Sequence, residues 1–593
     1  MPDPDSAAPA AGDDPGVAAA AGGTAHAARR PGRADDTAPP VPGHAPGAAP
    51  TVPGQAPEAA SAPPHSRATK GVARNTAIFS AATGLSRVAG LIREVVARGY
   101  FGTTGPASAF TVAFQVPNLI RGLFADAALS SAFVPVFTEL LEKDRRPDAF
   151  RLASTLLLVI IAALGAITAL FILGAGTVMP LFLLGNKFDQ ALVDLTVGLS
   201  RVMFPIVVLL GINGLVVGIL NAYGQFSVPA LAPLLWNAVI IGSLVVLHGL
   251  FTGDERIYAY AIGVLVGTVL QLAITLPGLR RLDFRLVSAY ELRDPLLRRV
   301  LVLMLPVTIG LGIINFDLLI NSIIGTLISK QTPSAIETAF RVYMLPQGMF
   351  SVAVATVLFP TLSRLAARRD FDALRSTMGT GLRQIFLLLV PAAVFSAVLA
   401  EPIVRLLFER GEFGPDSTDT VALALFWFSF SLPFAGANLL LTRTFFSLQE
   451  PWLPTRLAAG NLVINTIISL LLYRPFGIAG VVIGTAVASL GMMLGQCFVL
   501  RRLLGGDLEG AATLRALAQI AAASTLMGAL AWAGHAGLQG LLGDAFVAQL
   551  VAVGIAAAIA AAGYAGATLL LRVEEAQRIE RFVLARLRAR RTA

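Results

Sequence analysis

The sequence is poor in the residues that carry most metal, redox and nucleotide chemistry. Its single cysteine, Cys497, cannot form an intrachain disulfide. Of its five histidines only His248 and His535 lie beyond residue 70, which is too few for a histidine-based metal site. The chain has four lysines, and none ends the G-x-x-x-x-G-K-(S/T) pattern of a phosphate-binding loop. We therefore expect no metal centre, no nucleotide cofactor and no ATP-driven transport by this chain alone.

Catalytic motifs are missing too. The sequence has neither a G-x-S-x-G nucleophile elbow nor an H-E-x-x-H metal motif. Its loops are too short for a separate catalytic domain, and we find no acidic loops of the kind that a membrane-embedded glycosyltransferase needs. These absences argue against an enzyme.

Charge is scarce as well. Charged residues make up 14% of the chain and hydrophobic residues 55%, and the mean hydropathy is +0.72. Soluble domains are about 25% charged and about 45–50% apolar, so both values indicate a protein embedded in a bilayer. The pI of about 10.1 raises the alternative of a nucleic-acid partner. We expect none, because the basic residues lie in short loops between apolar runs and not on one face of a soluble domain.

Residues 1–70 consist mainly of Ala, Pro, Gly, Asp and Ser, with almost no large apolar side chains. Such a segment cannot bury enough surface to offset its chain entropy, so we predict a disordered cytoplasmic tail. Docking of a partner protein by this tail is the alternative. The basic start and short apolar core of a signal peptide are not found here.

Fourteen apolar runs are each long enough to cross a bilayer, which takes about twenty residues. They lie at 76–100, 107–140, 152–175, 191–221, 229–250, 257–278, 299–328, 335–366, 381–400, 419–447, 455–473, 477–502, 514–536 and 545–571. Cytoplasmic loops collect Lys and Arg, and the loops after the second, sixth, eighth and twelfth runs are rich in arginine. We therefore predict an all-α polytopic protein of a bacterial inner membrane, with about fourteen transmembrane helices and both termini cytoplasmic.

The first twelve runs contain an internal repeat. Residues 113–135 and 339–360 share Ala-Phe-x-Val, Gly-x-Phe and a closing Pro, and Asn237 recurs as Asn461. Duplication of six helices predicts two lobes related by a pseudo-twofold axis along the membrane normal, with a substrate site between them. Chance similarity between apolar helices is the alternative. The predicted segments are the tail 1–70, an N-lobe 71–290, a C-lobe 291–505, two further helices in 506–572 and a basic cytoplasmic tail 573–593.

Among the arginines inside the predicted spans, four are candidates for a substrate site: Arg87, Arg93, Arg121 and Arg341. A charge deep in a bilayer costs at least about 2.5–3.5 kcal/mol, so each should face a cavity or a partner. Acidic residues in the same helices are fewer, chiefly Glu94 and Asp126. A guanidinium fork can bind two phosphate oxygens, so this balance predicts an anionic, phosphate-bearing substrate.

The alternative is that each arginine is paired within the protein or caps a helix. Arg87 and Arg93 are six residues apart, which places them about 120° from each other on an ideal helix. They can share one cavity only if that cavity is wide or the helix bends.

A second set of polar residues lies in the other half: Asp317, Asn321, Asn461, Asn465 and Thr485. The members of the pairs 317/321 and 461/465 are four residues apart and so share a helix face. Clustered oxygen ligands can hold a hard cation such as Na⁺, and Asp317 can alternatively carry a proton. Hydrogen bonding between helices is the third interpretation.

The opening of the membrane region resembles a known family. NTAIFSAATGLSRVAGLIREVVARGYFG (75–102) and the stretch AFTVAFQVPNLIRGLFADAALSSAFVPVFTE (109–139) are similar to the start of the MurJ (MviN) lipid II flippases. AFRVYMLPQGMFSVAVATVLFPTLSRLA (339–366) resembles their eighth helix, and FERGEFGPDST (408–418) is also similar. The resemblance extends from about residue 75 to 505 and continues more weakly to 572.

This resemblance implies a member of the multidrug/oligosaccharidyl-lipid/polysaccharide exporter superfamily, with two six-helix lobes and two added C-terminal helices. It implies a flippase that carries an undecaprenyl-pyrophosphate-linked peptidoglycan precursor to the outer leaflet. The family's cavity arginines match Arg87, Arg93, Arg121 and Arg341 by motif. It also implies that helices 13 and 14 form a groove for the lipid tail, and that cell-wall synthesis proteins are potential partners.

The chain departs from the family pattern at Ser108 and Glu94, where aspartate is common, and at Gly122, where a second basic residue is common. Three alternatives stay open: a paralogue that carries another lipid-linked glycan, a multidrug or cation antiporter of the same superfamily, and a membrane scaffold for cell-wall enzymes. An antiporter of cationic drugs would need an acidic cavity, whereas a scaffold would tolerate loss of the arginines.

Overall fold

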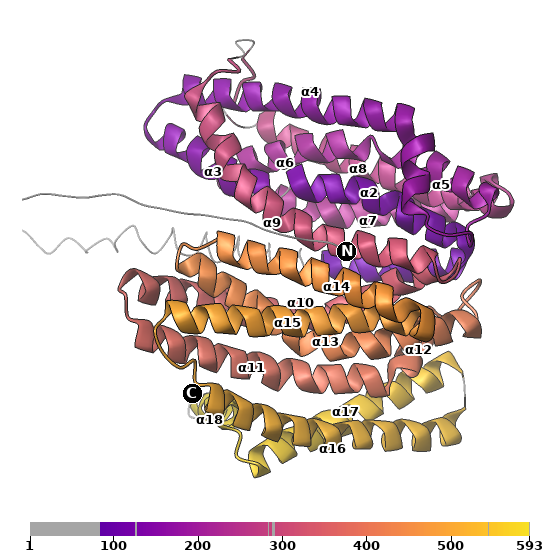
Figure 1. The fold of residues 1–593 in the computed structure, drawn as a ribbon, viewed down its shortest axis with the longest axis vertical. Coiled ribbons are helices and arrows are strands. Elements are labelled where there is room, and N and C mark those ends of the chain that lie inside the picture. Colours follow the sequence, from indigo (N-terminus) through magenta and orange to yellow (C-terminus); the bar gives the residue numbers. More distant parts are fainter. Residues whose placement is uncertain are drawn as a thin grey trace, which may run out of the picture. The chain divides into compact units, whose positions relative to one another are not determined.

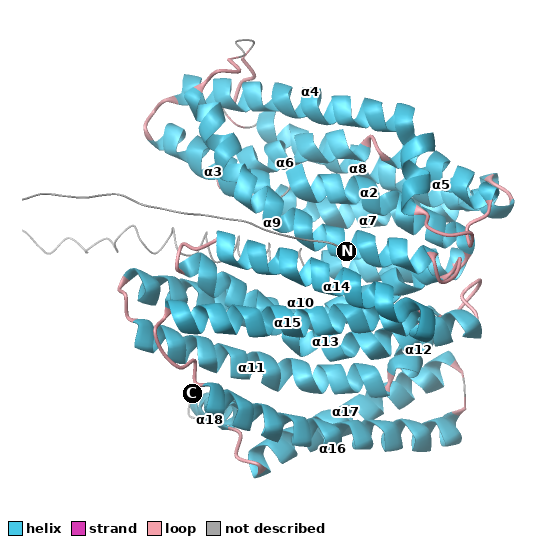
Figure 2. Ribbon diagram, viewed as in Figure 1, coloured by secondary structure: helices cyan, strands magenta, loops and turns pink. Residues whose placement is uncertain are grey.

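The computed structural model consists of helices joined by short loops (Figure 2). It describes residues 84–591 apart from 125–126, 281, 283, 288–290 and 544, and this part of the chain contains no β-strand. The predicted tail 1–70 lies outside the described residues. Helices suit these sequences because a bilayer offers no water to bond a backbone, and a helix satisfies its N–H and C=O groups internally.

The helices of the first half precede residue 281. They are a helix at residues 84–101, α2 (Gly105–Phe124), α3 (Ala127–Glu142), α4 (Arg146–Val178), α5 (Gln190–Met203), α6 (Ile206–Ala222), α7 (Ser227–Leu247) and α8 (Tyr258–Arg280), with the short 3₁₀ turns η1 (Met179–Phe182), η2 (His248–Leu250) and η3 (Gly253–Ile257).

The second half and the C-terminal region follow in chain order. They comprise α9 (Pro295–Thr326), α10 (Thr332–Ala367), α11 (Phe371–Val398), α12 (Ala400–Phe408), α13 (Pro415–Ser447), α14 (Trp452–Phe476), α15 (Ile478–Leu503), α16 (Gly510–Leu542), α17 (Phe546–Leu570) and α18 (Glu574–Arg591).

Each predicted membrane run falls on one helix or on two consecutive helices; run 191–221, for example, covers α5 and α6. Eleven of these segments are long and apolar enough to cross a membrane, judged on the described residues alone. The runs 76–100, 107–140 and 299–328 are helical where described but fall outside that set. In the first of them, four charged residues occur within 84–101, which lowers its hydropathy. The count of fourteen therefore stays a prediction.

Buried apolar side chains form two large clusters. One extends from Ala97 to Leu319 and the other from Ile324 to Val573. In the first, α8 packs against α6 and α7; in the second, α15 packs against α13 and α14, so the same neighbours recur in both halves. Figure 1 shows the two groups as an indigo-to-magenta layer and an orange layer, here called the N-lobe and the C-lobe.

The helices α16 and α17 pack against each other and, through α16, against α11 of the C-lobe (Figure 1, yellow). A small apolar cluster that includes Leu399, Met527 and Ala560 joins them to that lobe. A buried ion pair adds to this contact, because Arg383 on α11 donates from Nε to Glu575 at 2.6 Å and from Nη1 to Glu509 at 2.8 Å. The C-terminal helices are therefore fixed to the C-lobe.

The helix α9 contacts both lobes. It packs against α2 and α3 on one side and against α10 and α14 on the other. Its residues Leu297 and Met304 belong to the N-lobe cluster, whereas Ile324 belongs to the C-lobe cluster. The helix 84–101 behaves similarly, since Ala97 packs in the N-lobe and Leu91 packs against the C-lobe cluster.

Arginine-rich loops gather at one end of the helices. Arg299 of α9 lies 3.1 Å from Glu139 of α3, and Arg375 of α11 donates to the Leu504 carbonyl after α15 at 2.7 Å. The first contact joins the α3–α4 and α8–α9 connections, and the second joins the α10–α11 and α15–α16 connections. We call the end formed by these four connections the basic end.

Candidate functional site

A cavity of about 640 Å³, here called the N-lobe cavity, lies on the N-lobe side of the boundary between the lobes, where the helix 84–101, α2, α6, α7 and α8 face α9 and α10. Its polar lining residues are Arg93, Glu94, Arg98, Thr111, Gln115, Asn118, Arg121, Asn213, Trp236, Tyr260, Thr268, Gln271, Glu337 and Arg341. Four arginines against two glutamates leave this lining with a net charge of +2. The cavity is therefore suited to an anion.

The structure brings Arg93, Arg121 and Arg341 to this cavity, from three different helices. Arg87 does not line it. Its side chain is exposed and donates from Nη1 to the Gly348 carbonyl of α10 at 3.1 Å, so it joins the two lobes. The angular separation of Arg87 and Arg93 on one helix accounts for this difference. The predicted Asp126 lies outside the described residues.

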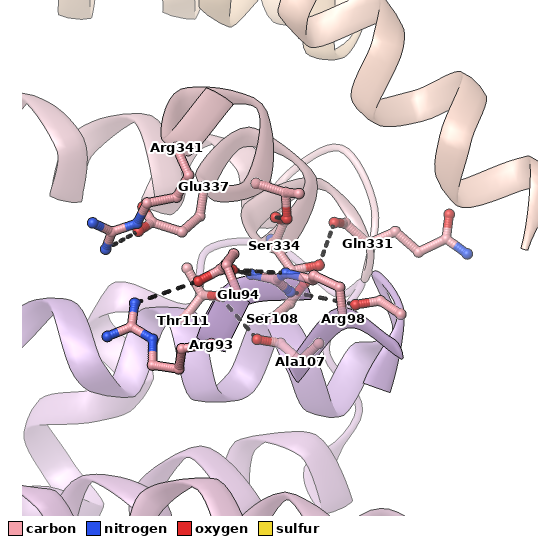
Figure 3. A network of polar contacts seen from close by, with 12 residues as sticks. Arg93, Glu94, Arg98, Ala107, Ser108, Thr111, Gln331, Ser334, Glu337 and Arg341 are labelled. Atoms are coloured by element: carbon pink, nitrogen blue, oxygen red, sulfur yellow. Dashed lines mark hydrogen bonds and ion pairs between the residues drawn. The ribbon is translucent and has the colours of Figure 1, made fainter. Parts of the chain in front are cut away.

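Glu94 holds two of the arginines in place (Figure 3). Its carboxylate lies 2.9 Å from Nη2 of Arg98 and 3.5 Å from Nη2 of Arg93. The Arg93 guanidinium also lies over the Trp236 ring, 5.0 Å from its centroid, a cation–π contact that orients it without neutralising it. The Arg93 Nε is buried and has no hydrogen-bond partner among the described residues. This donor remains available to a ligand.

Arg341 and Arg121 each have a partner on their own helix. Arg341 pairs with Glu337 one turn earlier on α10, at 2.6 Å, and its buried Nε likewise lacks a partner in the described part of the chain. Arg121 donates from Nε to the Asn118 amide oxygen at 3.0 Å. The buried Nε groups of Arg93 and Arg341 therefore leave the cavity with two donors that a ligand can use.

Several cavity residues were missed from the sequence. Arg98 lies inside the run 76–100, and its spacing of four from Glu94 was a visible signal for an ion pair. Asn213 and Gln271 are uncharged amides in apolar helices and give no sequence signal for a cavity. Trp236 reads from sequence as an ordinary apolar residue.

The second predicted set forms a hydrogen-bonded network in the C-lobe. The Asn465 amide donates to Asp317 at 2.7 Å and to Asn321 at 2.9 Å, and Asn321 donates to Thr485 at 3.1 Å. The network thus joins α9, α14 and α15. Asn461 lies one turn before Asn465, and its buried amide oxygen has no partner among the described residues.

Ser469 was missed from the sequence. Its hydroxyl donates to the Asn465 oxygen at 3.2 Å and to the Val481 carbonyl at 3.1 Å. No group of three or more His, Cys, Asp or Glu residues with metal-site spacing occurs in the described ranges. A cation in this network would therefore rely on amide, hydroxyl and carbonyl oxygens around the Asp317 carboxylate.

The lobes meet closely at the end opposite the arginine-rich loops. Glu412 donates its backbone N–H to the Gly99 carbonyl at 2.9 Å, and the hydroxyls of Thr103 and Ser417 lie 2.8 Å apart. The backbone N–H of Ser334 donates to the Ser108 hydroxyl at 3.2 Å (Figure 3). We call this set of contacts between the lobes the latch.

Two further contacts extend the latch. The Leu184 N–H donates to the Thr326 hydroxyl at 3.0 Å, and Lys330 pairs with Asp189 at 2.5 Å. The Lys330 ammonium and, to a smaller extent, the Leu192 amide hold the pKa of Asp189 below its usual range. Because all of these contacts join the N-lobe to residues at or after the end of α9, they close this end of the molecule.

Residues 97–545 match the family of lipid II flippases named MurJ. The lipid II flippase MurJ of Burkholderia cenocepacia is 32% identical over 422 residues, which cover 69% of this chain and 81% of that protein. A probable lipid II flippase MurJ of Rhizobium meliloti is 31% identical, with 68% of this chain and 76% of that protein covered.

Among solved structures, a lipid II flippase MurJ in an inward closed conformation has a TM-score of 0.68 at 22% identity, covering 83% of this chain and 98% of that one. An inward-facing multidrug resistance MATE family transporter has a TM-score of 0.61 at 15% identity, over 71% of this chain and 94% of the other. These likenesses show a shared transporter fold. The apolar helices and the sequence matches identify a multi-pass inner-membrane protein, and those matches show that the chain belongs to the MurJ lipid II flippase family.

Proposed function

We propose that this chain moves lipid II, the undecaprenyl-pyrophosphate-linked peptidoglycan precursor, from the inner to the outer leaflet by alternating access. The observation that carries the proposal is the excess of arginine over glutamate in the N-lobe cavity. A pyrophosphate presents several anionic oxygens, which match guanidinium forks held in a low-dielectric site. The same charge balance disfavours a cationic drug as the substrate.

In this mechanism Arg93, Arg121 and Arg341 bind the pyrophosphate while the latch is closed. Glu94 and Glu337 keep the guanidinium groups of Arg93 and Arg341 oriented before the substrate arrives. Rocking of the lobes breaks the latch and separates α10 from the helix 84–101, which carry different arginines. Loss of the arginines of one helix lowers the affinity for the pyrophosphate, which is then released on the outer side of the membrane.

The proposed orientation puts the basic end in the cytoplasm, because cytoplasmic loops collect Arg and Lys. Both termini are then cytoplasmic. The latch faces the outer side, so the substrate enters from the cytoplasmic side. Cell-wall synthesis proteins are proposed partners, with residues 1–70 as the segment that would contact them.

The test is complementation of a flippase-depleted bacterium, scored by the appearance of lipid II in the outer leaflet. We expect Arg121→Gln and Arg341→Gln to lower the flipping rate by about tenfold to a hundredfold, the worth of a charge-assisted hydrogen bond. Arg364→Gln, an exposed change at the basic end, is the matched control and should leave the rate unchanged. Rescue by both cavity variants would contradict the arginine mechanism, and failure of the unmodified chain to rescue would favour another lipid-linked glycan.

We further propose that the C-lobe network couples transport to Na⁺ or H⁺. Asp317 has one oxygen bonded to Asn465, and the Asn461 oxygen is buried without a partner among the described residues, which leaves oxygen ligands for a small cation. A proton on Asp317 would satisfy the same carboxylate. A membrane potential is a further energy source, worth roughly 2.3 kcal/mol per charge at 100 mV.

Reconstituted vesicles separate these sources. A rate that follows the Na⁺ gradient and is lost in Asp317→Asn indicates Na⁺ coupling, and a rate that follows the pH gradient indicates H⁺ coupling. Dependence on neither gradient, with Asp317→Asn fully active, would leave the network as hydrogen bonding between helices.

A further inference from the structure

A second group of arginines lies at the basic end, at the start of α9. Arg293, Arg298 and Arg299 line a shallow pocket of about 520 Å³ together with Pro295, Val302 and Leu303. None of these six residues lines the N-lobe cavity. We call this the α9 arginine pocket.

Two of its guanidinium groups are not engaged by the described part of the protein. Arg299 pairs with Glu139, which also binds Lys143. Arg293 and Arg298 are exposed and form no ion pair or side-chain hydrogen bond with any described residue.

The two carboxylates that flank Arg293 most closely in the sequence already have other partners. Asp294 is buried and accepts the Leu296 N–H at 2.8 Å as the cap of α9. Glu291 lies 3.7 Å from Arg151 of α4. The α9 arginine pocket therefore carries positive charge that neighbouring described side chains do not neutralise.

Apolar side chains continue the pocket toward the membrane. Val302 and Leu303 follow Arg298 and Arg299 by four residues each, so they lie on the same helix faces about 6 Å deeper along α9. They are 60% and 45% exposed. In a membrane-spanning helix such side chains contact hydrocarbon. A cationic rim above an open apolar surface matches the two parts of a phospholipid.

We propose that the α9 arginine pocket binds an anionic phospholipid of the cytoplasmic leaflet, with Arg293 and Arg298 on the phosphate and an acyl chain along Val302 and Leu303. Basic pockets at the cytoplasmic side of membrane helices suit such headgroups. The exposed position favours a bulk phospholipid over the transported precursor, because the pocket is separate from the cavity and open to the bilayer. The lipid thereby contacts the helix that packs against both lobes.

The test uses the full chain in nanodiscs, with bound lipid counted by native mass spectrometry. Arg293→Gln combined with Arg298→Gln should lower the preference for phosphatidylglycerol over phosphatidylcholine by about tenfold or more. Arg364→Gln combined with Arg368→Gln removes the same charge from exposed positions at the same end, outside the pocket, and should leave that preference intact. The lysine pair Arg293→Lys and Arg298→Lys should retain most of it.

An unchanged preference in the first pair, or an equal loss in both glutamine pairs, would overturn the proposal in favour of diffuse attraction to the surface charge. A second arm offers undecaprenyl pyrophosphate as the only anionic lipid. If the first pair loses this lipid but keeps phosphatidylglycerol, the pocket is a substrate-entry site and the phospholipid proposal is wrong. Failure of the flippase proposal would appear separately, in the cavity variants.

Discussion

The latch makes a sharp prediction at Gly411. Its φ of +60° lies in the left-handed region, and a Cβ built there would stand 2.2 Å from the Gly99 carbonyl oxygen of the other lobe. A real Cβ does not approach an oxygen so closely, so Gly411→Ala must push the two backbones apart by more than about 1 Å. We therefore expect this substitution to open the latch.

The magnitude follows from what is lost. Separation breaks the hydrogen bond from the Glu412 N–H to the Gly99 carbonyl, which contributes about 1 kcal/mol. Relief of the overlap adds about 1–2 kcal/mol, as for an added methyl in a well-packed site. A total of about 2–3 kcal/mol shifts the equilibrium between closed and open latch by roughly 30-fold to 150-fold.

The assay is labelling of Ser108→Cys by a membrane-impermeant maleimide added from outside, in a Cys497→Ser background. Ser108 is a fully buried member of the latch, so the labelling rate of a cysteine at this position reports opening. The matched control is Gly414→Ala in the same loop, where φ is −84° and a Cβ meets nothing within 4 Å. Unchanged labelling in Gly411→Ala, or an equal rise in Gly414→Ala, would refute the reasoning.

Three other predictions concern contacts between the lobes and within the C-lobe. Oxidation of Thr103→Cys combined with Ser417→Cys should link the lobes and stop flipping, and a reductant should restore the rate, because the two hydroxyls lie 2.8 Å apart. Acidification of the outside from pH 7 to about 3 should increase latch opening. The pKa of Asp189 is lowered in the closed latch, so its ion pair with Lys330 contributes fully above the usual aspartate pKa near 3.9 and is lost as the pH falls through the lowered pKa. Arg383→Gln should lower the free energy of unfolding by about 3–5 kcal/mol, measured by thermal denaturation in detergent, because it leaves a carboxylate buried without its partner.

Each of these has its own control. Either single cysteine variant should stay active under oxidation, and activity of the oxidised double variant would show that the latch need not open. Asp189→Asn should remove the effect of acid, so a persisting effect assigns it to another group. Arg405→Gln, which loses partly exposed pairs with Glu401 and Glu409, should cost less than about 1 kcal/mol, and an equal cost at Arg383 would contradict the importance of burial.

Sequence reasoning reached the helices and the substrate chemistry because both depend on local signals. Long apolar runs define the helices, and charge within them marks residues that need a cavity or a partner. Arg93, Arg121 and Arg341 can be selected in this way from the sequence alone, and all three line the cavity. Their carboxylate partners are also visible in the sequence, because Glu94 is adjacent to Arg93 and Glu337 lies four residues before Arg341. What the sequence does not show is that the three arginines meet at one cavity.

The same reasoning could not separate Arg87 from the others. A charged residue inside a predicted span indicates that a partner exists. It does not indicate whether that partner is a ligand, a carboxylate or, for Arg87, the Gly348 carbonyl. The C-lobe set shows the opposite case. Spacing of four placed Asp317 with Asn321, and the structure then joined that pair to Asn465 through hydrogen bonds between helices. Arg383 lies inside the run 381–400 and so gives a charge signal, but its partners Glu509 and Glu575 are 126 and 192 residues away in the chain, and the sequence does not identify them.

The division of α9 between two cores has a mechanical consequence. With Leu297 and Met304 packed in one lobe and Ile324 in the other, the lobes cannot rotate as two rigid bodies joined by a passive linker. Any relative motion must bend α9, twist it or slide it past one set of neighbours, and the helix 84–101 is under the same constraint through Leu91 and Ala97. Deforming these two helices costs free energy, and this cost contributes to the barrier between the states with the latch closed and open.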